Sequence, residues 1–355
     1  MKKHHFFTMA ISLVFNSIIL AQSYQKSLAI NPTDSFQITA SAIFPNGELV
    51  VASQQQYKTA PGGSGIPGIS SSVGRIVLRR LDKNGNPLWK KFFHNSVARI
   101  MFAKTTSSDD ILVCGAFHDS LRFSPTKTLY AAIYRANSFV ACYDGLGNFK
   151  WVYSTPADPN YSKFYNTFDI RQNKIYLPYN TQFSSDSRIR VLNMLGDSIN
   201  DFQISDGAIL ISHFKFDAAG NVYLCGTGNG SATIGGQPVG NDSTIISYSA
   251  FIAKLDSNFQ QSWSDQFRYI TIDFYPEMAF TSSRVAFLVD TIPQPNGIGN
   301  YHILKYYDLN GNALRRDSIG PGFFSKMHQA KALTAIGNDF YLATLNGWDT
   351  VVVQQ

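Results

Sequence analysis

Short apolar stretches alternate with tight polar turns along the chain, and their spacing is that of β-strands. The clearest example runs from Phe214 to Trp263, where the turn Asp217–Asn221 precedes the apolar stretch Val222–Gly226. Apolar side chains occupy both alternating sets of this stretch, which predicts a strand that is covered on both faces. A second strand over Phe251–Leu255 and a third segment around Trp263 complete the unit. Sheets stacked on both sides of each strand are the arrangement found in β-propeller blades.

Two sequence signatures alternate at a spacing that fits repeated sheets. The first is a polar turn followed by a short apolar strand, and it recurs at Asn46–Val51, Asp109–Cys114, Asn173–Leu177, Asn221–Cys225, Ser283–Leu288 and Asn338–Leu342. The second is a strand that ends in Asp or Asn, then a Gly/Asn turn and often a Trp, and it recurs at Asp82, Asp144, Asn193, Asp256 and Asp308. Gly and Asn suit such turns because they tolerate positive φ. Successive copies of the second signature lie 49 to 63 residues apart, which is about the span of four short strands with their loops.

The repeats predict an all-β fold, a β-propeller of about six four-stranded blades. Five units are complete, and a sixth is divided between Tyr24–Leu28 and Asn338–Leu345. Pairing of the N- and C-terminal segments would close the ring and remove its edge strands. Because the second signature does not follow Asn338, we expect the last blade to be short or the chain to be part of a longer one.

The unit Asp217–Trp263, with Gly235-Gly236 in its loop and Phe251–Lys254 in its second strand, resembles the SBBP-type β-propeller repeat of exported bacterial proteins. The resemblance covers about residues 24–345. The stretch 161–205 departs most from the pattern, because it lacks the Trp and shortens the loop to Asn180–Ser187. The resemblance implies a propeller in an exported protein, and it is nearly silent on activity, because propellers carry many unrelated functions.

The first 23 residues have the pattern of a secretory signal peptide. Lys2 and Lys3 supply a positive start, Phe6–Leu20 is an apolar core of 15 residues, and small residues permit cleavage after Ala21 or Ser23. A membrane anchor would need about 20 apolar residues, and no later segment is long and apolar enough either. We therefore expect a signal peptide over residues 1–23 and a propeller domain over residues 24–355. The protein is expected to be exported, to the extracellular space, the cell surface or the periplasm, with no membrane span.

Composition and charge fit this picture and give no sign of nucleic-acid binding. The chain has 355 residues, of which 44% are hydrophobic and 15% charged, so it can bury a large core. Its formal net charge is +6, which becomes +4 once Lys2 and Lys3 are removed. The densest basic pairs are scattered over different strands and indicate solvated strand faces rather than one stripe for nucleic acid; they are Arg79-Arg80, Lys90-Lys91 and Arg315-Arg316.

The sequence predicts no metal and no cofactor. Asp82–Asn86 and Asp308–Asn312 look superficially like the start of an EF-hand loop, but their Gly is fourth rather than sixth, and Phe93 and Ile319 stand where the loop needs a Glu. The run Gly226–Gly230 follows a strand but precedes no helical pattern, so it does not indicate a dinucleotide loop. No two histidines of the mature chain share a metal-like spacing, and these are His94, His118, His213, His302 and His328.

The three cysteines are expected to be buried thiols. Cys114 and Cys225 occupy equivalent strand positions two repeats apart, so they should lie far from each other. Cys114 and Cys142 fall in neighbouring strands of one repeat, and a disulfide between them is the alternative, since export would permit it. Bridges between adjacent strands are geometrically demanding. The chain has no Cys-x-x-Cys motif, so a zinc site is not indicated.

No pattern singles out a catalytic residue, and we expect a non-catalytic binding or scaffold module whose partner is an extracellular glycan or protein. Loops on one face of a rigid scaffold are a usual place for binding. Four long loops join the first and second strands of their repeats and should project from one face; they are Tyr57–Gly74, His118–Asn137, Thr227–Ser249 and Asp290–Asn300.

The alternative function is a propeller enzyme. Leu81–Trp89 also resembles the Trp-docking repeat of quinoprotein dehydrogenases, although that family's adjacent cysteine pair is missing and no calcium cluster matches. A glycoside hydrolase is the other enzymatic alternative, because two carboxylates from different blades leave no signal in sequence spacing. A third hypothesis makes the propeller a spacer for further domains.

Overall fold

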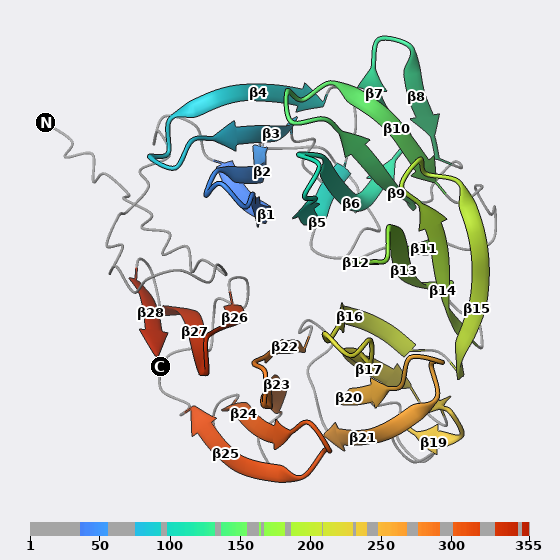
Figure 1. Cartoon of the computed structure of the whole chain (residues 1–355), viewed down its shortest axis with the longest axis vertical. Coiled ribbons are helices and arrows are strands. Elements are labelled where there is room, and N and C mark those ends of the chain that lie inside the picture. Colours follow the sequence, from blue (N-terminus) through green and yellow to red (C-terminus); the bar gives the residue numbers. More distant parts are fainter. Residues whose placement is uncertain are drawn as a thin grey trace, which may run out of the picture. The chain divides into compact units, whose positions relative to one another are not determined.

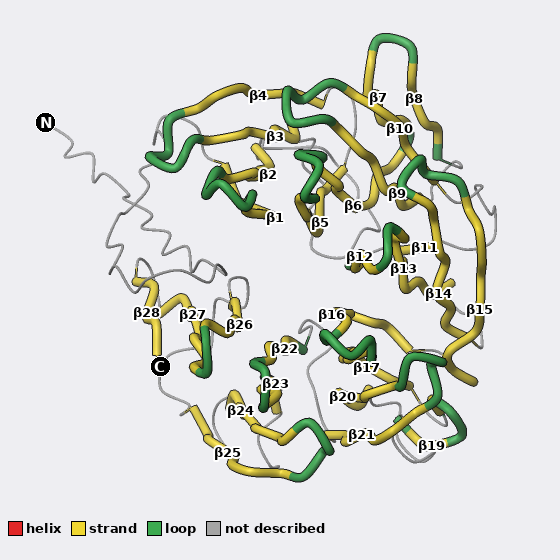
Figure 2. The backbone as a smooth tube through the Cα atoms, viewed as in Figure 1, coloured by secondary structure: helices red, strands yellow, loops and turns green. Residues whose placement is uncertain are grey.

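The computed structural model describes residues 36–55, 75–93, 98–131, 136–154, 163–164, 167–181, 186–207, 209–229, 232–239, 248–267, 276–291, 301–319, 331–346 and 350–354. Every regular element in these ranges is a β-strand (Figure 2). The same ranges contain no helix with the length and apolar character needed to cross a membrane. Contacts divide the chain into two compact units, one within Asp34–Gln203 and the other within Ile204–Gln355.

The unit within Asp34–Gln203 contains three successive sheets (Figure 1). The first sheet has the order β1 (Phe36–Ile43), β2 (Leu49–Gln55), β3 (Arg75–Leu81) and β4 (Pro87–Phe93). The second has the order β5 (Ala98–Thr105), β6 (Ile111–His118), β9 (Ala136–Tyr143) and β10 (Phe149–Ser154), with a separate hairpin of β7 (Ser120–Ser124) and β8 (Lys127–Tyr130) between β6 and β9. In the third, β11 (Lys163–Phe164) and β12 (Asp169–Arg171) both pair with β13 (Lys174–Thr181), and β14 (Asp186–Asn193) and β15 (Ser198–Asp206) follow.

The unit within Ile204–Gln355 repeats this plan. The fourth sheet is β16 (Ile209–Phe216), β17 (Val222–Asn229), β20 (Tyr248–Leu255) and β21 (Gln261–Phe267). The last residues of β15, from Ile204 on, also belong to this unit, and Ser205 and Asp206 pair with the short hairpin of β18 (Thr233–Ile234) and β19 (Gln237–Pro238). The fifth is β22 (Glu277–Phe280), β23 (Arg284–Thr291), β24 (Tyr301–Asp308) and β25 (Ala313–Ile319). The sixth described sheet contains β26 (Lys331–Ile336), β27 (Asp339–Asn346) and β28 (Thr350–Gln354).

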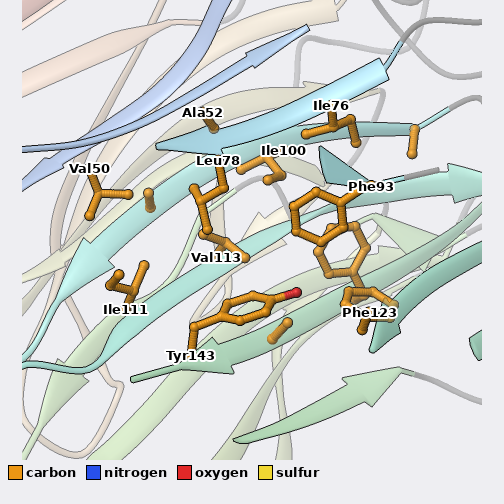
Figure 3. Packing of buried hydrophobic residues seen from close by; sticks show 14 of the residues in the cluster. Val50, Ala52, Ile76, Leu78, Phe93, Ile100, Ile111, Val113, Phe123 and Tyr143 are labelled. Carbon is orange, nitrogen blue, oxygen red and sulfur yellow. The ribbon is translucent and has the colours of Figure 1, made fainter. Parts of the chain in front are cut away.

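Successive sheets pack face to face within each unit. Val50 and Leu78 of the first sheet share one apolar core with Val113 and Tyr143 of the second (Figure 3). Further cores join the second sheet to the third, the fourth to the fifth and the fifth to the sixth. As a result β6 is buried along Ile111–Phe117 without alternation. The prediction of strands covered on both faces is therefore confirmed.

Each sheet begins one strand earlier than the sequence signatures indicated. In the fourth sheet, β16 precedes the turn Asp217–Asn221 and pairs with β17 as the first strand. The long loops therefore join the second and third strands of each sheet, and the assignment to first and second strands was wrong. Within each sheet, the turns between the first and second strands and between the third and fourth strands lie at one end of the strands. The long loop between the second and third strands therefore lies at the other end, so the prediction that the loops project from one end holds for each sheet. The last sheet has a third strand, β28, that the sequence did not predict. Tyr24–Leu28, the expected closing segment, lies outside the described residues.

The repeated turns are closed by their own side chains. Asp82 Oδ1 accepts hydrogen bonds from the backbone N–H groups of Asn84 and Asn86 at 2.8 Å each, and Oδ2 accepts one from the Asn86 amide at 2.8 Å. Asp308 and Asn312 form the same pattern. Hydrogen bonds from these Asn side chains lower the pKa of both aspartates. Because the turn itself uses both oxygens, turn formation explains the Asp-Asn-Gly pattern without calcium.

The three cysteines are free and buried, so the thiol prediction is confirmed. Cys114 and Cys142 lie in the paired strands β6 and β9, as expected, and are not directly opposite each other. Burial raises the pKa of Cys142 to about 12, and it raises the pKa values of Cys114 and Cys225 as well. These thiols are therefore structural, apolar core residues.

Candidate functional site

A tryptophan in the fourth strand of three sheets reaches the turn of the next sheet. Each tryptophan is the seventh residue after the Asp of its turn: Trp89 after Asp82, Trp151 after Asp144 and Trp263 after Asp256. Their indole Nε1 atoms donate to backbone carbonyls of the next sheet: Gly145 at 2.8 Å, Met194 at 2.9 Å and Leu309 at 3.2 Å. The three tryptophans therefore occupy equivalent environments, as a repeated blade requires. We call the space that each indole fills the Trp wedge.

Cations complete two of the Trp wedges. Arg80 is paired across the strands with Trp89, and its Nη1 donates to the same Gly145 carbonyl at 2.6 Å. The Arg80 guanidinium also binds Glu48 and Asp109, at 2.6 and 2.8 Å, so it joins turns of the first and second sheets. Lys254, paired with Trp263, donates from Nζ to the Leu309 carbonyl at 2.8 Å. An aromatic ring, a cation and a turn carbonyl thus come together at Trp89 and at Trp263.

The fifth sheet lacks this tryptophan. Arg315 stands at the seventh position after Asp308 and pairs across the strands with Tyr306. Its side chain is 71% exposed, and its Nε donates to Asp317 at 2.7 Å rather than to a turn of the next sheet. A cavity of about 280 Å³ remains there, which we call the fifth-sheet cavity. Its lining residues are Arg284, Tyr306, Leu314, Arg315, Asn338, Asp339 and Phe340.

Two arginines and two aromatic rings face each other in the fifth-sheet cavity. The Tyr306 and Phe340 ring centroids are 5.6 Å apart. The Arg284 guanidinium lies 5.7 Å from the Phe340 ring and donates to the backbone carbonyl of Asn338. The Arg315 guanidinium lies 5.9 Å from the Tyr306 ring. Cation–π contacts of this kind hold planar cations over aromatic faces, and the arrangement offers a ligand both rings and positive charge.

The β7–β8 hairpin is a second exposed feature, inserted between the second and third strands of the second sheet. Leu121 and Phe123 are fully buried in the core of the first two sheets, and the Phe123 ring lies 5.0 Å from that of Phe139. The alternate face carries Arg122 and Tyr130, both exposed, and the exposed fraction of Tyr130 is 74%. Buried anchors on one face and exposed charge on the other follow from the two-residue period of a strand. The hairpin is therefore held rigidly while one face is free.

The predicted loops are only partly within the described residues. Tyr57–Gly74 lies outside them, and Asp290–Asn300 is described only at its first two residues. His118 precedes the β7–β8 hairpin, and burial lowers its pKa. His94, His328 and the side chain of His302 lie outside the described residues. In the described part of the chain, no group of three or more His, Cys, Asp or Glu residues could hold a metal ion.

His213 forms an ion pair that the sequence did not reveal. Its Nε2 lies 3.3 Å from Glu277 Oε2, which links the first strands of the fourth and fifth sheets. Burial opposes protonation of the imidazole, and Lys215 does so weakly, but the Glu277 carboxylate outweighs both and raises the His213 pKa. The partners are 64 positions apart, so no local pattern could announce the pair.

Stability should depend on pH through His213. The pKa of His213 is higher in the folded state than in the unfolded state. The ion pair therefore stabilises the fold fully below about pH 6.5, and this stabilisation is lost as the pH rises through the folded-state pKa. His213→Gln is expected to cost about 1 kcal/mol at pH 5.5 and less at pH 8.5. Urea unfolding of both proteins at the two pH values measures this, and Glu277→Gln should show the same trend. Equal losses at both pH values would contradict the pair's role.

The fifth-sheet cavity was not predicted from the sequence, although a signal existed. Comparison of the turns shows Trp at the seventh position after Asp82, Asp144 and Asp256, and Arg315 after Asp308. The third repeat, with Asn200 at this position, also lacks the Trp, and a missing anchor marks a place where the packing must differ. The sequence could not show that the arginine turns outward toward Asp317.

Comparisons with known proteins give a fold and no family. No family model matches the chain, and no curated protein matches it. Among solved structures, the one titled "NanB plus Optactamide" is similar with a TM-score of 0.51 and 9% identity, over 97% of this chain and 68% of that chain. The β-propeller domain of the Trilobed protease from Pyrococcus furiosus is similar with a TM-score of 0.43 and 8% identity, over 90% of this chain and 81% of that chain. An α-L-arabinanase from Penicillium chrysogenum, complexed with arabinobiose, is similar with a TM-score of 0.46 and 10% identity, over 86% of this chain and 88% of that chain. The successive, mostly four-stranded sheets and the similarity to the structure titled "NanB plus Optactamide" support one conclusion: the chain has an all-β fold of the β-propeller type.

Proposed function

We propose that this chain is an exported, non-catalytic β-propeller that binds an extracellular glycan or protein through the insertions between the second and third strands of its sheets. One observation carries the proposal: the β7–β8 hairpin is anchored by the fully buried Leu121 and Phe123 while it exposes Tyr130. Tyr combines a large rigid contact area with a polar end, which makes it frequent at binding surfaces. Arg122 adds positive charge to the same exposed face.

Binding by the hairpin can be tested with purified protein. Screens on a glycan array and against cell-surface proteins would identify the partner. Tyr130→Ala is expected to weaken its binding about tenfold or more, because a central aromatic contact is commonly worth about 2 kcal/mol. Leu146→Ala is the matched control, because Leu146 is 78% exposed on a turn at the opposite end of the second sheet. The proposal would be overturned if the screens detect no partner, or if Tyr130→Ala and Leu146→Ala weaken binding equally.

Export, the SBBP-type repeat and ring closure belong to the same proposal. The signal-like residues 1–23 motivate export, and the mass of the mature protein from its native host tests it, with cleavage expected after Ala21 or Ser23. A full-length mass would contradict export.

Closure of about six blades by Tyr24–Leu28 is supported by the likeness of this segment to the fourth-strand segment Trp89–Phe92. A crystal structure in which residues 24–28 pair with no strand would contradict closure.

A further inference from the structure

The fifth-sheet cavity lies where other sheets hold an indole ring. Trp89, Trp151 and Trp263 fill the Trp wedges of the first, second and fourth sheets. Arg315 takes the equivalent position in the fifth sheet, and the cavity of about 280 Å³ opens beside it. Packing of the fifth sheet against the sixth is maintained by an apolar core that includes Leu304 and borders the cavity through Phe340. The cavity therefore results from one missing ring rather than from separated sheets.

The walls of the cavity keep what an aromatic ring needs. Trp263 stacks on Tyr307 with ring centroids 5.5 Å apart and 27° between the planes, and a cation, Lys254, is paired with it. In the fifth-sheet cavity, Tyr306 and Phe340 supply rings and Arg315 supplies a cation. A flat aromatic ligand can pack against such groups with favourable ring–ring and cation–π contacts.

Arg284 adds a second guanidinium to the cavity, and among the described residues its hydrogen bond is to a backbone carbonyl rather than to a carboxylate. Arg315 is paired with Asp317 at 2.7 Å, whereas the Arg284 guanidinium donates only to a backbone carbonyl, that of Asn338. A guanidinium has five N–H donors in a planar fork that fits a carboxylate with two parallel hydrogen bonds. A ligand carboxylate is therefore the group that best satisfies the remaining donors of Arg284.

We propose that the fifth-sheet cavity binds a small planar aromatic ring that carries a carboxylate, an aryl or indolyl acid, with the ring packed against Tyr306, Phe340 and the Arg315 side chain and the carboxylate on Arg284. A volume of about 280 Å³ lies at the lower limit of ligand pockets, which suits one ring system and excludes an oligosaccharide. This site is at the turn end of the strands, opposite the insertions, so it is independent of the binding surface proposed above.

The test uses isothermal titration of the mature protein with three probes: indole-3-acetate, indole and glucuronate. Indole-3-acetate is expected to bind about tenfold more tightly than indole, because the carboxylate adds a charge-assisted hydrogen-bonded pair. Glucuronate, which has the carboxylate without an aromatic ring, should bind more weakly than both. Absence of saturable binding by indole-3-acetate, or equal binding of glucuronate, would overturn the proposal.

Variants assign the binding to this cavity. Arg315→Trp restores the ring found in the other sheets and should abolish binding of indole and indole-3-acetate. Arg284→Met should weaken the binding of indole-3-acetate about tenfold and leave the affinity for indole unchanged. Arg316→Met removes the same charge from the next residue of β25, whose side chain points to the other face, and should change neither. Circular dichroism verifies folding, and Arg284→Met decides the test should Arg315→Trp fail to fold. Unchanged affinity in Arg284→Met would contradict the assignment.

Discussion

Replacing Trp89 by alanine is expected to lower the free energy of unfolding by about 3 kcal/mol. The indole packs against the core shared by the first and second sheets, and its Nε1 donates to the Gly145 carbonyl at 2.8 Å. Alanine would leave a void between β4 and the next turn and would remove this hydrogen bond. Urea unfolding followed by far-UV circular dichroism measures the change.

Two further variants separate the causes of this loss. Leu88, the neighbouring residue, is 51% exposed, so Leu88→Ala should change stability by about 0.5 kcal/mol or less. Trp89→Phe keeps a ring and loses the N–H donor, which should cost about 1 kcal/mol. The carbonyl of Gly145 stays satisfied in that variant, because Arg80 Nη1 also donates to it at 2.6 Å. The role of the Trp wedge is refuted if Trp89→Ala is no less stable than Leu88→Ala.

The parts of the fold that the sequence predicts are those whose causes are local. A turn such as Asp82–Asn86 is closed by bonds within five residues, so its type can be recognised from the chain alone. Strands such as β6, with apolar residues at every position of Ile111–Phe117 except glycine, indicate burial on both faces. Equivalent environments for the three tryptophans followed from the repeat, and the structure confirms them.

Strands without these local marks were missed. β16 begins with three apolar residues, Ile209–Ile211, but then mixes polar and apolar residues and carries a bulge near Ser212, so it has neither the preceding turn nor the longer apolar run of β17. β28 (Thr350–Gln354) was missed because no Asp-Gly-Asn turn accompanies it. First and last strands of a sheet are specified mainly by the neighbours on which they pack, and those neighbours are distant in sequence.

The candidate sites depend even more on distant contacts. The fifth-sheet cavity joins Arg284 and Arg315 to Phe340 of the following sheet. The sequence shows that Arg315 replaces a tryptophan, but only the structure shows its bond to Asp317 and the space that remains. The buried face of the β7–β8 hairpin has an alternating pattern that the sequence carries, while its packing on Phe139 required the fold.

A second large effect is expected from Gly226→Ala, which should lower the free energy of unfolding by about 2–3 kcal/mol. Gly226 lies in β17 opposite Ile211, where a bulge in β16 brings the two backbones close together. A methyl group on Gly226 would lie 2.0 Å from the carbonyl oxygen of Leu210. The obstacle is backbone rather than a flexible side chain, so β16 and β17 would have to separate in a sheet that is buried on both sides.

The cost should be a few kcal/mol rather than a failure to fold, because the first sheet accommodates Ser53 at the corresponding place opposite Ile38, beside a similar bulge. Gly236→Ala is the matched control: Gly236 has a φ of +78° and open space around its Cα, so only left-handed backbone strain of about 1 kcal/mol is expected there. Urea unfolding compares the two variants with the parent chain. A loss in Gly226→Ala no greater than that in Gly236→Ala would show that the strands separate freely. In that case the close approach at the bulge would not be what requires glycine in β17.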